Sequence, residues 1–257
     1  MSSGGGKHRF FVPVDLESAE HVELPERVSH QISRVLRLRP GDAIRLFDGR
    51  GNEASARICE IDKRSAVAEV SDGPIPGLRA GPPDIHLGIA LIKSDRFDQA
   101  LQKVTELGVT SITGIETTRS VVSLSADRAR SRHERWQRIV IEALEQCERA
   151  DTVDVNGPVT MQEFVLSAGS GARFIAAERA NASALIELLP EDSEQLYLLI
   201  GPEGGFTDDE VAFAEQAGFT PVSLGPTILR SETAAIAAVS VVRASLDRKA
   251  APEHIPD

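Results

Sequence analysis

The sequence predicts an α/β protein in which a small unit of strands precedes a larger domain built on a parallel sheet. Within residues 9–70, short runs of partly alternating polarity indicate strands. From residue 85 onward, apolar runs of strand length alternate with segments of helical spacing, a pattern typical of parallel α/β sheets. Residues 72–83 are rich in glycine and proline, as linkers are. We therefore expect domains at residues 1–72 and 84–257, joined by a linker at residues 73–83.

The first domain is predicted to be a small β-barrel. Its expected strands cover residues 9–14, 43–47, 54–61 and 65–70. A turn at residues 48–52 joins two of these strands, which indicates a hairpin. Pro25 opens a helix in which Val28, Ile32 and either Val35 or Leu36 recur at the spacing of an inward face.

The second domain is predicted to alternate strands with helices. Its expected strands cover residues 85–92, 111–115, 174–177, 196–200 and 221–224. Ser94 or Asp95 caps a helix that ends at Gly108, and a long helix covers residues 132–149. Ser231 caps a last helix of small residues.

Two glycine-containing turns organise this second domain. The expected strand at residues 196–200 breaks at Gly201, and the strand at residues 221–224 breaks at Gly225. Each turn leads into a helix, the first through a capping box of Thr207 with Glu210. We expect the two turns to lie at the carboxyl ends of adjacent strands and to form a crevice, where open α/β sheets bind ligands.

The turns favour some ligands over others. Neither turn has the Gly-x-Gly-x-x-Gly spacing, and no Gly-Lys-Ser/Thr phosphate loop is present, so a diphosphate is not predicted. Pro202 fixes one backbone torsion and gives the first turn a rigid edge against which a flat adenine fits. A tight turn without any ligand is the alternative interpretation.

Composition excludes several classes of protein. No apolar run approaches the roughly 20 residues of a membrane span. Residues 1–6 lack the apolar core of a secretory signal. Cys59 and Cys147 form no zinc motif, and nothing else indicates a metal. We therefore expect a cytoplasmic protein with reduced thiols and with neither a membrane nor a metal as partner.

The charge of the chain is segregated along the sequence. The formal net charge is -11, yet residues 27–50 carry six arginines against two aspartates, and residues 128–138 carry five arginines against one glutamate. Residues 178–215 hold ten acids against one arginine. An anionic partner is therefore compatible with basic faces on an acidic protein, although each cluster alone is also consistent with a solvated surface.

Ordered sequence blocks resemble one family. The two turns, 198–207 and 224–234, are similar to the cofactor loops of SPOUT-class RNA methyltransferases. In detail the chain resembles the 16S ribosomal RNA uridine N3-methyltransferase family, named for uridine 1498. The further matching blocks are His8 to Val12, His30 with Val35 to Arg37 and Gly41-Asp42, Lys93 through Glu106 to Val109, and Trp136 through Glu145 to Arg149. The matches span Lys7 to Arg243; Thr227, where the family often has a basic residue, departs from the pattern.

This resemblance implies a fold, a reaction and partners. It implies a PUA-like RNA-binding domain, followed by a SPOUT domain whose carboxyl-terminal segment threads a loop to form a trefoil knot, and a homodimer packed around that knot. It also implies S-adenosyl-L-methionine as cofactor and 16S rRNA of the small ribosomal subunit as substrate. The expected reaction is methylation of uridine N3.

The cofactor is expected between the two turns. Apolar side chains would sandwich the adenine and main-chain groups would read its edge, although core packing is an alternative for the apolar residues. Glu203 is expected near the ribose or the amino acid moiety, or else faces solvent. The expected cofactor residues are Leu199, Ile200, Gly201, Glu203, Gly204, Gly205, Leu224, Gly225, Ile228, Leu229, Thr233 and Ala234.

Two residues of the second turn are candidates for catalysis. Uridine N3 is a poor nucleophile until its proton leaves, so a carboxylate base is useful, and Glu232 is the candidate. Arg230 is the candidate for holding the uridine oxygens or stabilising the anion. The alternatives are that Glu232 interacts only with the helix dipole and that Arg230 is a surface cation.

Contacts with RNA are expected from cations that are also consistent with an ordinary surface. These are Arg9, Arg34, Arg37, Lys93, Arg96 and Arg119. Two other functions are compatible with the same residues. One is a methyltransferase of the same fold acting on another RNA or atom, such as a tRNA ribose 2′-hydroxyl. The other is a non-catalytic RNA-binding factor for ribosome assembly.

Overall fold

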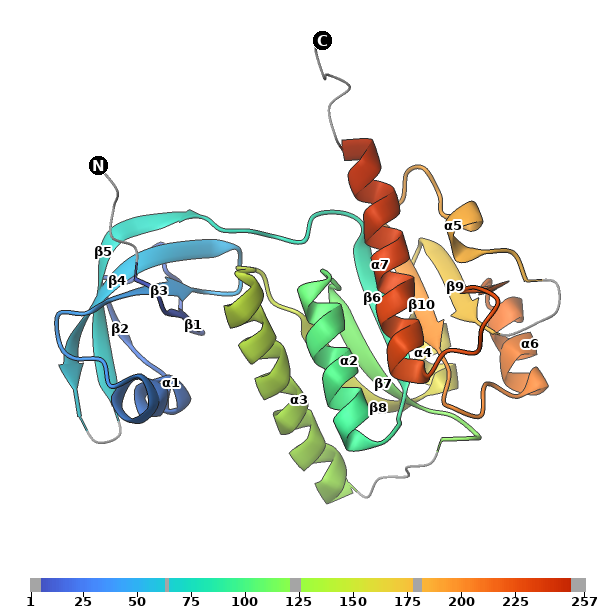
Figure 1. Ribbon diagram of the computed structural model, residues 1–257, viewed down its shortest axis with the longest axis horizontal. Coiled ribbons are helices and arrows are strands. Elements are labelled where there is room, and N and C mark those ends of the chain that lie inside the picture. Colours follow the sequence, from blue (N-terminus) through green and yellow to red (C-terminus); the bar gives the residue numbers. More distant parts are fainter. Residues whose placement is uncertain (1–5, 63–64, 121–125, 178–181, 251–257) are drawn as a thin grey trace, which may run out of the picture. The chain divides into compact units, whose positions relative to one another are not determined.

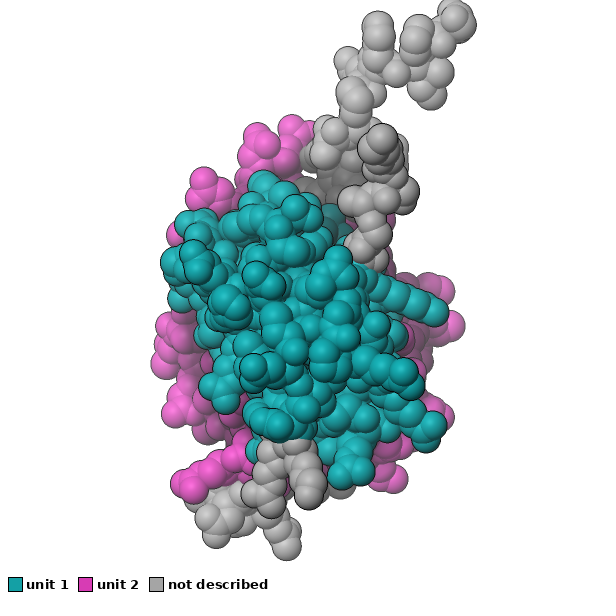
Figure 2. Space-filling model, turned by 90° about the vertical axis from the view of Figure 1, so that its left-hand side faces the viewer, with its two compact units in different colours: residues 1–79, 144–152 teal, residues 80–143, 153–257 magenta. Residues whose placement is uncertain are grey.

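The chain divides into two compact units. The computed structural model describes residues 6–62, 65–120, 126–177 and 182–250 (Figure 1). Unit 1 comprises residues 1–79 and 144–152, and unit 2 comprises residues 80–143 and 153–257 (Figure 2). This division differs from the expected boundaries, because residues 144–152 are part of unit 1 and because the expected linker starts inside a strand that runs to Pro76.

Unit 1 is built on a five-stranded sheet in the order β1-β3-β4-β5-β2. The strands are β1 (Arg9–Phe11), β2 (His21–Glu23), β3 (Ala43–Phe47), β4 (Asn52–Ile61) and β5 (Ala66–Pro76). β1 pairs with β3 in parallel, and the other pairs are antiparallel. The predicted hairpin at residues 48–52 is confirmed as the connection between β3 and β4. The short edge strand β2 was not predicted.

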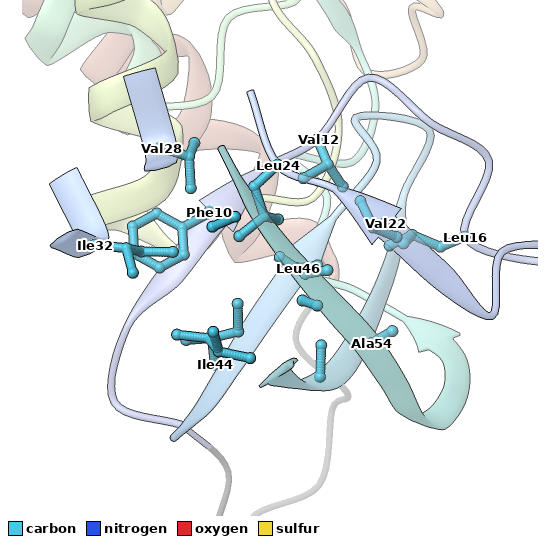
Figure 3. Packing of buried hydrophobic residues seen from close by; sticks show 14 residues of the cluster. Phe10, Val12, Leu16, Val22, Leu24, Val28, Ile32, Ile44, Leu46 and Ala54 are labelled. Atoms are coloured by element: carbon cyan, nitrogen blue, oxygen red, sulfur yellow. The ribbon is translucent and has the colours of Figure 1, made fainter. Parts of the chain in front are cut away.

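The core of unit 1 lies between this sheet and one helical segment (Figure 3). The segment starts as α1 (Glu26–His30) and continues as a π-helix, η1 (Gln31–Leu36). Val28 and Ile32 are fully buried against strand residues such as Phe10, which confirms these two positions of the predicted inward face. At its third position Leu36 packs against the core, whereas Val35 is exposed. Arg37 ends the π-helix in the left-handed region at φ 54°.

Arg9 explains why residues 144–152 belong to unit 1. Its guanidinium donates hydrogen bonds to the carbonyl oxygens of Leu144 at 3.0 Å and Arg149 at 2.9 Å, and its Nε lies 2.9 Å from Glu53 Oε2. The guanidinium also stacks on the Phe47 ring, 3.8 Å from the ring centroid. A buried arginine with all of these partners ties β1, β4 and the 144–152 segment together.

Unit 2 contains a six-stranded sheet in which every pair is parallel. The strands are β6 (Asp84–Ala90), β7 (Ser111–Glu116), β8 (Asp154–Thr160), β9 (Ala172–Ala176), β10 (Gln195–Ile200) and β11 (Thr220–Val222). Their order is β11-β9-β10-β6-β7-β8. The predicted parallel sheet is confirmed, but the expectation that the two glycine turns follow adjacent strands is wrong, because β9 lies between β10 and β11.

Helices cover both faces of this sheet. They are α2 (Ser94–Glu106), α3 (Ala126–Cys147), α4 (Met161–Ser167), α5 (Leu185–Leu188), α6 (Asp208–Gln216) and α7 (Ser231–Ala250). α2 and α7 pack against each other on one face (Figure 1). α4 and α6 cover the other face, where Phe164 and Val211 pack on Leu199 of β10. Trp136 of α3 stacks on Phe97 of α2 with ring centroids 4.6 Å apart.

The helix starts agree only in part with the predicted caps. The capping box of Thr207 and Glu210 is confirmed at the start of α6. Neither Ser94 nor Asp95 is a cap, because Lys93 occupies that position without a side-chain hydrogen bond. Ser231 is not a cap either, because it is the first residue of α7 itself, and the amide of Ala234 donates to the carbonyl of Arg230.

Candidate active site

A cavity of about 360 Å³ lies at the carboxyl ends of β9, β10 and β11. The turn after β10 forms one wall, the turn after β11 forms a second, and the end of β9 lies between them. The lining residues are Arg119, Ala176, Ala177, Ile200 to Phe206, Asp208, Val211, Val222 to Gly225, Thr227 to Leu229, Ser231 and Ala234. The carboxyl ends of parallel strands are where α/β sheets bind ligands.

Most of the residues expected to bind the cofactor line this cavity. Those brought together are Ile200, Gly201, Glu203, Gly204, Gly205, Leu224, Gly225, Ile228, Leu229 and Ala234. Leu199 is not among the lining residues: its side chain is fully buried in the core under α4 and α6. Thr233 is also absent from the lining, and its side chain is exposed. Ile228 is 82% exposed, so it stands at the open side of the cavity.

The contribution of β9 to the cavity was not predicted from the sequence. Ala176 and Ala177, at the end of β9, line the cavity together with Phe206 and Ser223. Their small side chains leave room between the two turns. The sequence does contain a pair of alanines at the carboxyl end of an expected strand. This pair did not indicate a cavity wall, because the order of the strands in the sheet was not known.

Glycines keep the cavity open. Gly205 has a φ of 68° and Gly225 a φ of 128°, and a Cβ at either position would meet no other atom within 4 Å. A Cβ at Gly201 would lie 3.0 Å from two ring atoms of Phe206, so the backbone and this ring are in close contact. The cavity therefore has apolar walls, exposed main-chain groups and glycine turns on two sides, which suit a flat ligand such as a nucleoside.

Glu232 and Arg96 form a charged pair beside the cavity. Glu232 is 7% exposed, and its Oε1 lies 3.8 Å from Arg96 Nε. Its Oε2 is buried and has no hydrogen-bond partner among the described residues. Arg96 also pairs with Glu203, so one guanidinium of α2 joins the turn after β10 to the first turn of α7.

Arg230 and Lys93 are both exposed. Neither side chain forms an ion pair or a hydrogen bond with another described residue. Arg230 lies one residue before α7 and two before Glu232, whereas Lys93 lies one residue before α2, the helix that carries Arg96. Both cations are therefore available to an anionic or carbonyl-bearing ligand.

Arg119 approaches the glycine turn from the loop after β7. Its Nη1 donates a hydrogen bond to the Gly204 carbonyl at 2.8 Å, and its side chain is exposed. The preceding residue is fixed, because the amide of Thr118 donates to Oε1 of Glu210 at 2.8 Å. The cavity thus has a cation on its wall in addition to its glycine turns.

The other expected RNA contacts divide into two groups. Arg34 and Arg37 are exposed in unit 1. The structure contradicts the expectation for Arg9, which is 6% exposed and has the structural contacts described above. Arg96 is engaged by two carboxylates, so its first role is in the ion pairs rather than at a free surface.

His86 is a perturbed titratable group away from the cavity. Its Nδ1 lies 2.8 Å from Ser111 Oγ, and its ring stacks on Tyr197 with centroids 4.7 Å apart. Burial lowers the pKa of His86 below its ordinary value of 6.5, against the opposing effect of Asp84 and Asp154. The neutral imidazole therefore fits a structural role in the sheet.

Two kinds of site are absent from the part of the chain that the structure describes. No group of three or more histidine, cysteine, aspartate or glutamate side chains there could hold a metal ion. In the same residues, no helix is both long enough and apolar enough to cross a bilayer.

Comparisons with known proteins agree with this geometry. A family model described as an RNA methyltransferase domain matches residues 80–243. A second model, described as an RNA methyltransferase PUA domain, matches residues 24–71. The first match contains every residue that lines the cavity.

Several relatives named ribosomal RNA small subunit methyltransferase E are similar over most of the chain. The protein of Synechocystis is 35% identical over 85% of this chain and 71% of its own length. The protein of Bacillus subtilis is 30% identical over 91% of this chain and 95% of its own length.

Two solved structures are similar in fold and contain S-adenosylmethionine. One is the enzyme of that name from Neisseria gonorrhoeae, with a TM-score of 0.83 and 34% identity, covering 92% of this chain and 97% of its own. The other is a protein of Legionella pneumophila, with a TM-score of 0.87 and 33% identity over the same shares.

Proposed function

Because this chain belongs to the RNA methyltransferase family whose model matches residues 80–243, we propose that it transfers a methyl group from S-adenosyl-L-methionine to N3 of one uridine of 16S rRNA. The uridine is the one numbered 1498 in that family's usual numbering. The observation that carries the proposal is the cavity at the ends of β9, β10 and β11, with glycine turns on two of its sides. Relatives that are 30 to 35% identical and bear the name of a small-subunit rRNA methyltransferase support the choice of substrate.

The residues present fit the adenosyl part of the cofactor. Ile200, Leu224 and Leu229 supply apolar wall, and the open space at Gly205 and Gly225 lets a ligand approach the main chain. Cavities of this kind hold small ligands by apolar contact with a few main-chain hydrogen bonds. When bound, S-adenosylmethionine supplies an electrophilic methyl group on a sulfonium.

Glu232 is the proposed acceptor of the N3 proton. Uridine N3 carries a proton at neutral pH, and its removal produces the nucleophile. Support comes from the buried Oε2 of Glu232, which has no partner among the described residues, while Arg96 orients the carboxylate through Oε1. Arg230 lies two residues before Glu232 in the chain and is exposed, and we propose that it stabilises the negative charge on the uracil oxygens.

RNA binding is proposed for the exposed cations. Arg34 and Arg37 in unit 1, with Lys93 and Arg119 in unit 2, are exposed and carry no ion pair with another described residue. Phosphate contacts require cations that are not already neutralised. The residues that stay in this proposal are therefore these four, and Arg9 is left out because it is buried.

The experiment that tests the function compares modified nucleosides. Mass spectrometry of 16S rRNA from strains with and without the gene should show 3-methyluridine only when the gene is present. The purified protein with S-adenosylmethionine should restore the modification on small subunits or rRNA from the deletion strain. Loss of a different modified nucleoside would favour another RNA or atom, and no cofactor binding at millimolar concentration would favour an RNA-binding assembly factor.

We also propose a homodimer that acts in the cytoplasm, with the carboxyl-terminal segment threaded as a trefoil knot. Support for a close pairing of two copies comes from α7, where Ala237, Ser240 and Val241 are only partly buried and have small or compact side chains. Sedimentation equilibrium tests the dimer, and a single species with the mass of one chain at micromolar concentration would exclude it.

A further inference from the structure

The loop after β7 is held by the carboxylate of Glu210, which accepts hydrogen bonds from two different segments. Glu210, in the first turn of α6, is 4% exposed. Its Oε2 accepts a hydrogen bond from the amide of Thr207 at 2.8 Å, which closes the capping box of α6. Its Oε1 accepts a second hydrogen bond, also 2.8 Å long, from the amide of Thr118, which lies 92 residues earlier in the chain.

The loop held in this way is a closed turn. The amide of Thr117 donates to Ser120 Oγ at 3.0 Å, the two hydroxyl oxygens lie 2.9 Å apart, and the amide of Ser120 donates to the Thr117 carbonyl at 3.0 Å. Residues 117–120 therefore form a turn with its own hydrogen bonds, and the Glu210 carboxylate fastens the amide in its middle. Such local bonds limit the conformations of a surface turn.

Arg119 is the residue that this turn presents. Its Nη1 donates to Gly204 O at 2.8 Å, and its Cδ and Cβ pass 3.5 and 3.6 Å from the position of a Cβ on Gly204. A guanidinium has five N–H donors, and the only hydrogen bond that Arg119 makes to another described residue uses Nη1. The remaining donors are on an exposed side chain at the cavity wall, and their fork geometry matches a phosphate.

We propose that Glu210 is a positioning residue for RNA binding, which acts by holding the 117–120 turn so that Arg119 meets a phosphate of the RNA at the cavity. The inference rests on the proposed function and adds to it how one RNA contact is kept in place. Without Glu210, the turn keeps its internal hydrogen bonds but loses its attachment to α6. Arg119 then samples positions away from Gly204, and the affinity for RNA falls while the cofactor walls remain.

The chain offers a matched control for this carboxylate. Thr160 and Glu163 form the same capping box at the start of α4, with Glu163 accepting from the Thr160 amide at 2.7 Å. The only hydrogen bonds of the Glu163 carboxylate to described residues are with Thr160. Glu163→Gln therefore disturbs a capping box to which no second loop is attached. Glu210→Gln disturbs a capping box too, but its side-chain amide also replaces the carboxylate that accepts from both the Thr207 and the Thr118 N–H groups.

The test uses the full-length protein and three measurements. Amide hydrogen exchange at Thr118 should be about tenfold faster in Glu210→Gln and unchanged in Glu163→Gln. The KM for small-subunit RNA should rise about tenfold in Glu210→Gln, within the range that one hydrogen bond to a charged group contributes. Calorimetric affinity for S-adenosylmethionine should change by less than about twofold, since the glycine turns are intact.

A double-mutant cycle separates positioning from folding. In an Arg119→Met background, Glu210→Gln should raise the KM for RNA by less than about twofold further, because the side chain it positions is already gone. If Glu210→Gln fails to fold, Glu210→Asp keeps the charge but shortens the reach to Thr118, and the same results are expected from it.

Three outcomes would overturn the inference. They are unchanged exchange at Thr118, equal effects of Glu210→Gln and Glu163→Gln on the KM for RNA, and a loss of cofactor affinity with the KM for RNA unchanged. The last would mean that Arg119 holds the carboxylate of the cofactor rather than a phosphate. Failure of the proposed function is distinct, because it would appear as an inactive wild-type protein while the exchange measurement at Thr118 still tests the attachment.

Discussion

Removal of the Arg96 side chain should destabilise unit 2 far more than removal of an ordinary surface cation. The pair of Arg96 Nε with Glu232 Oε1 is 3.8 Å long, and the two side chains are 25% and 9% exposed. At an effective dielectric constant of about 20, Coulomb's law gives an attraction of about 4 kcal/mol at this distance. Arg96 is partly exposed to solvent and also pairs with Glu203, and both effects reduce the attraction between Arg96 and Glu232. We expect Arg96→Met to lower the free energy of unfolding by about 3 kcal/mol, because it leaves a buried carboxylate without its partner.

Urea denaturation with a matched control measures this effect. Lys103 pairs with Glu106 on the same helix, but these side chains are 41% and 23% exposed. Lys103→Met should therefore lower the free energy of unfolding by less than about 1 kcal/mol. Glu232→Gln combined with Arg96→Met should recover about 2 kcal/mol relative to the sum of the single variants, since a neutral amide needs no counter-charge.

Two results would refute this reasoning. Equal effects of Arg96→Met and Lys103→Met on the free energy of unfolding would show that the pair of Arg96 with Glu232 contributes little. Additive effects of Arg96→Met and Glu232→Gln would show that the two side chains do not interact. If, in addition, Arg96→Met weakened RNA binding with no change in stability, the sequence-based expectation of an RNA contact at Arg96 would be the correct one.

Three further predictions concern the base, the cavity and pH. Glu232→Gln should reduce the methylation rate at least about a hundredfold with calorimetric cofactor affinity within twofold of wild type; a rate within tenfold would exclude Glu232 as the proton acceptor. Gly225→Ala should weaken S-adenosylmethionine binding about tenfold. Gly41 is also at positive φ with open space around it but lies outside the cavity, so Gly41→Ala should lower only the melting temperature. Equal cofactor affinity in the two variants would place the ligand elsewhere. Burial depresses the pKa of His86 below 6.5 in the folded state, so the unfolded state binds more protons and stability should fall as pH drops through about 6.5; His86→Phe should flatten this fall in melting temperature, and an unchanged pH profile would contradict it.

The sequence predicted the kind of sheet correctly but not its order. Alternating strand and helix patterns are local, and they sufficed for a parallel sheet in unit 2. The order of strands depends on which segments pair across the fold. In this sheet β9, which precedes both β10 and β11 in the sequence, lies between them. The two glycine turns nevertheless line one cavity, because the small side chains of Ala176 and Ala177 at the end of β9 leave the space between the turns open.

Charged side chains were harder to place than glycines. A glycine at a strand end has a local reason to be there, whereas the partner of a charged side chain is set by tertiary structure. Arg9 pairs with Glu53, 44 residues away, and Arg96 pairs with Glu232 on a different helix. Sequence alone gave both arginines the same expected role at an RNA surface, whereas the long-range contacts place Arg9 in a buried core and pair Arg96 with a buried carboxylate.

The acidic net charge and an RNA substrate are compatible once the cations are sorted by their partners. With a net charge of -11, the chain as a whole repels phosphate. Arg9 and Arg96 do not offset this repulsion at the surface, because carboxylates of the same chain already neutralise them. Arg34, Arg37, Lys93 and Arg119 are exposed and have no ion pair with other described residues, so their charge is available to phosphate. Recognition by these cations is stronger when each is held in place, and a buried carboxylate such as Glu210 can supply that constraint to a loop without adding negative charge to the surface that meets the RNA.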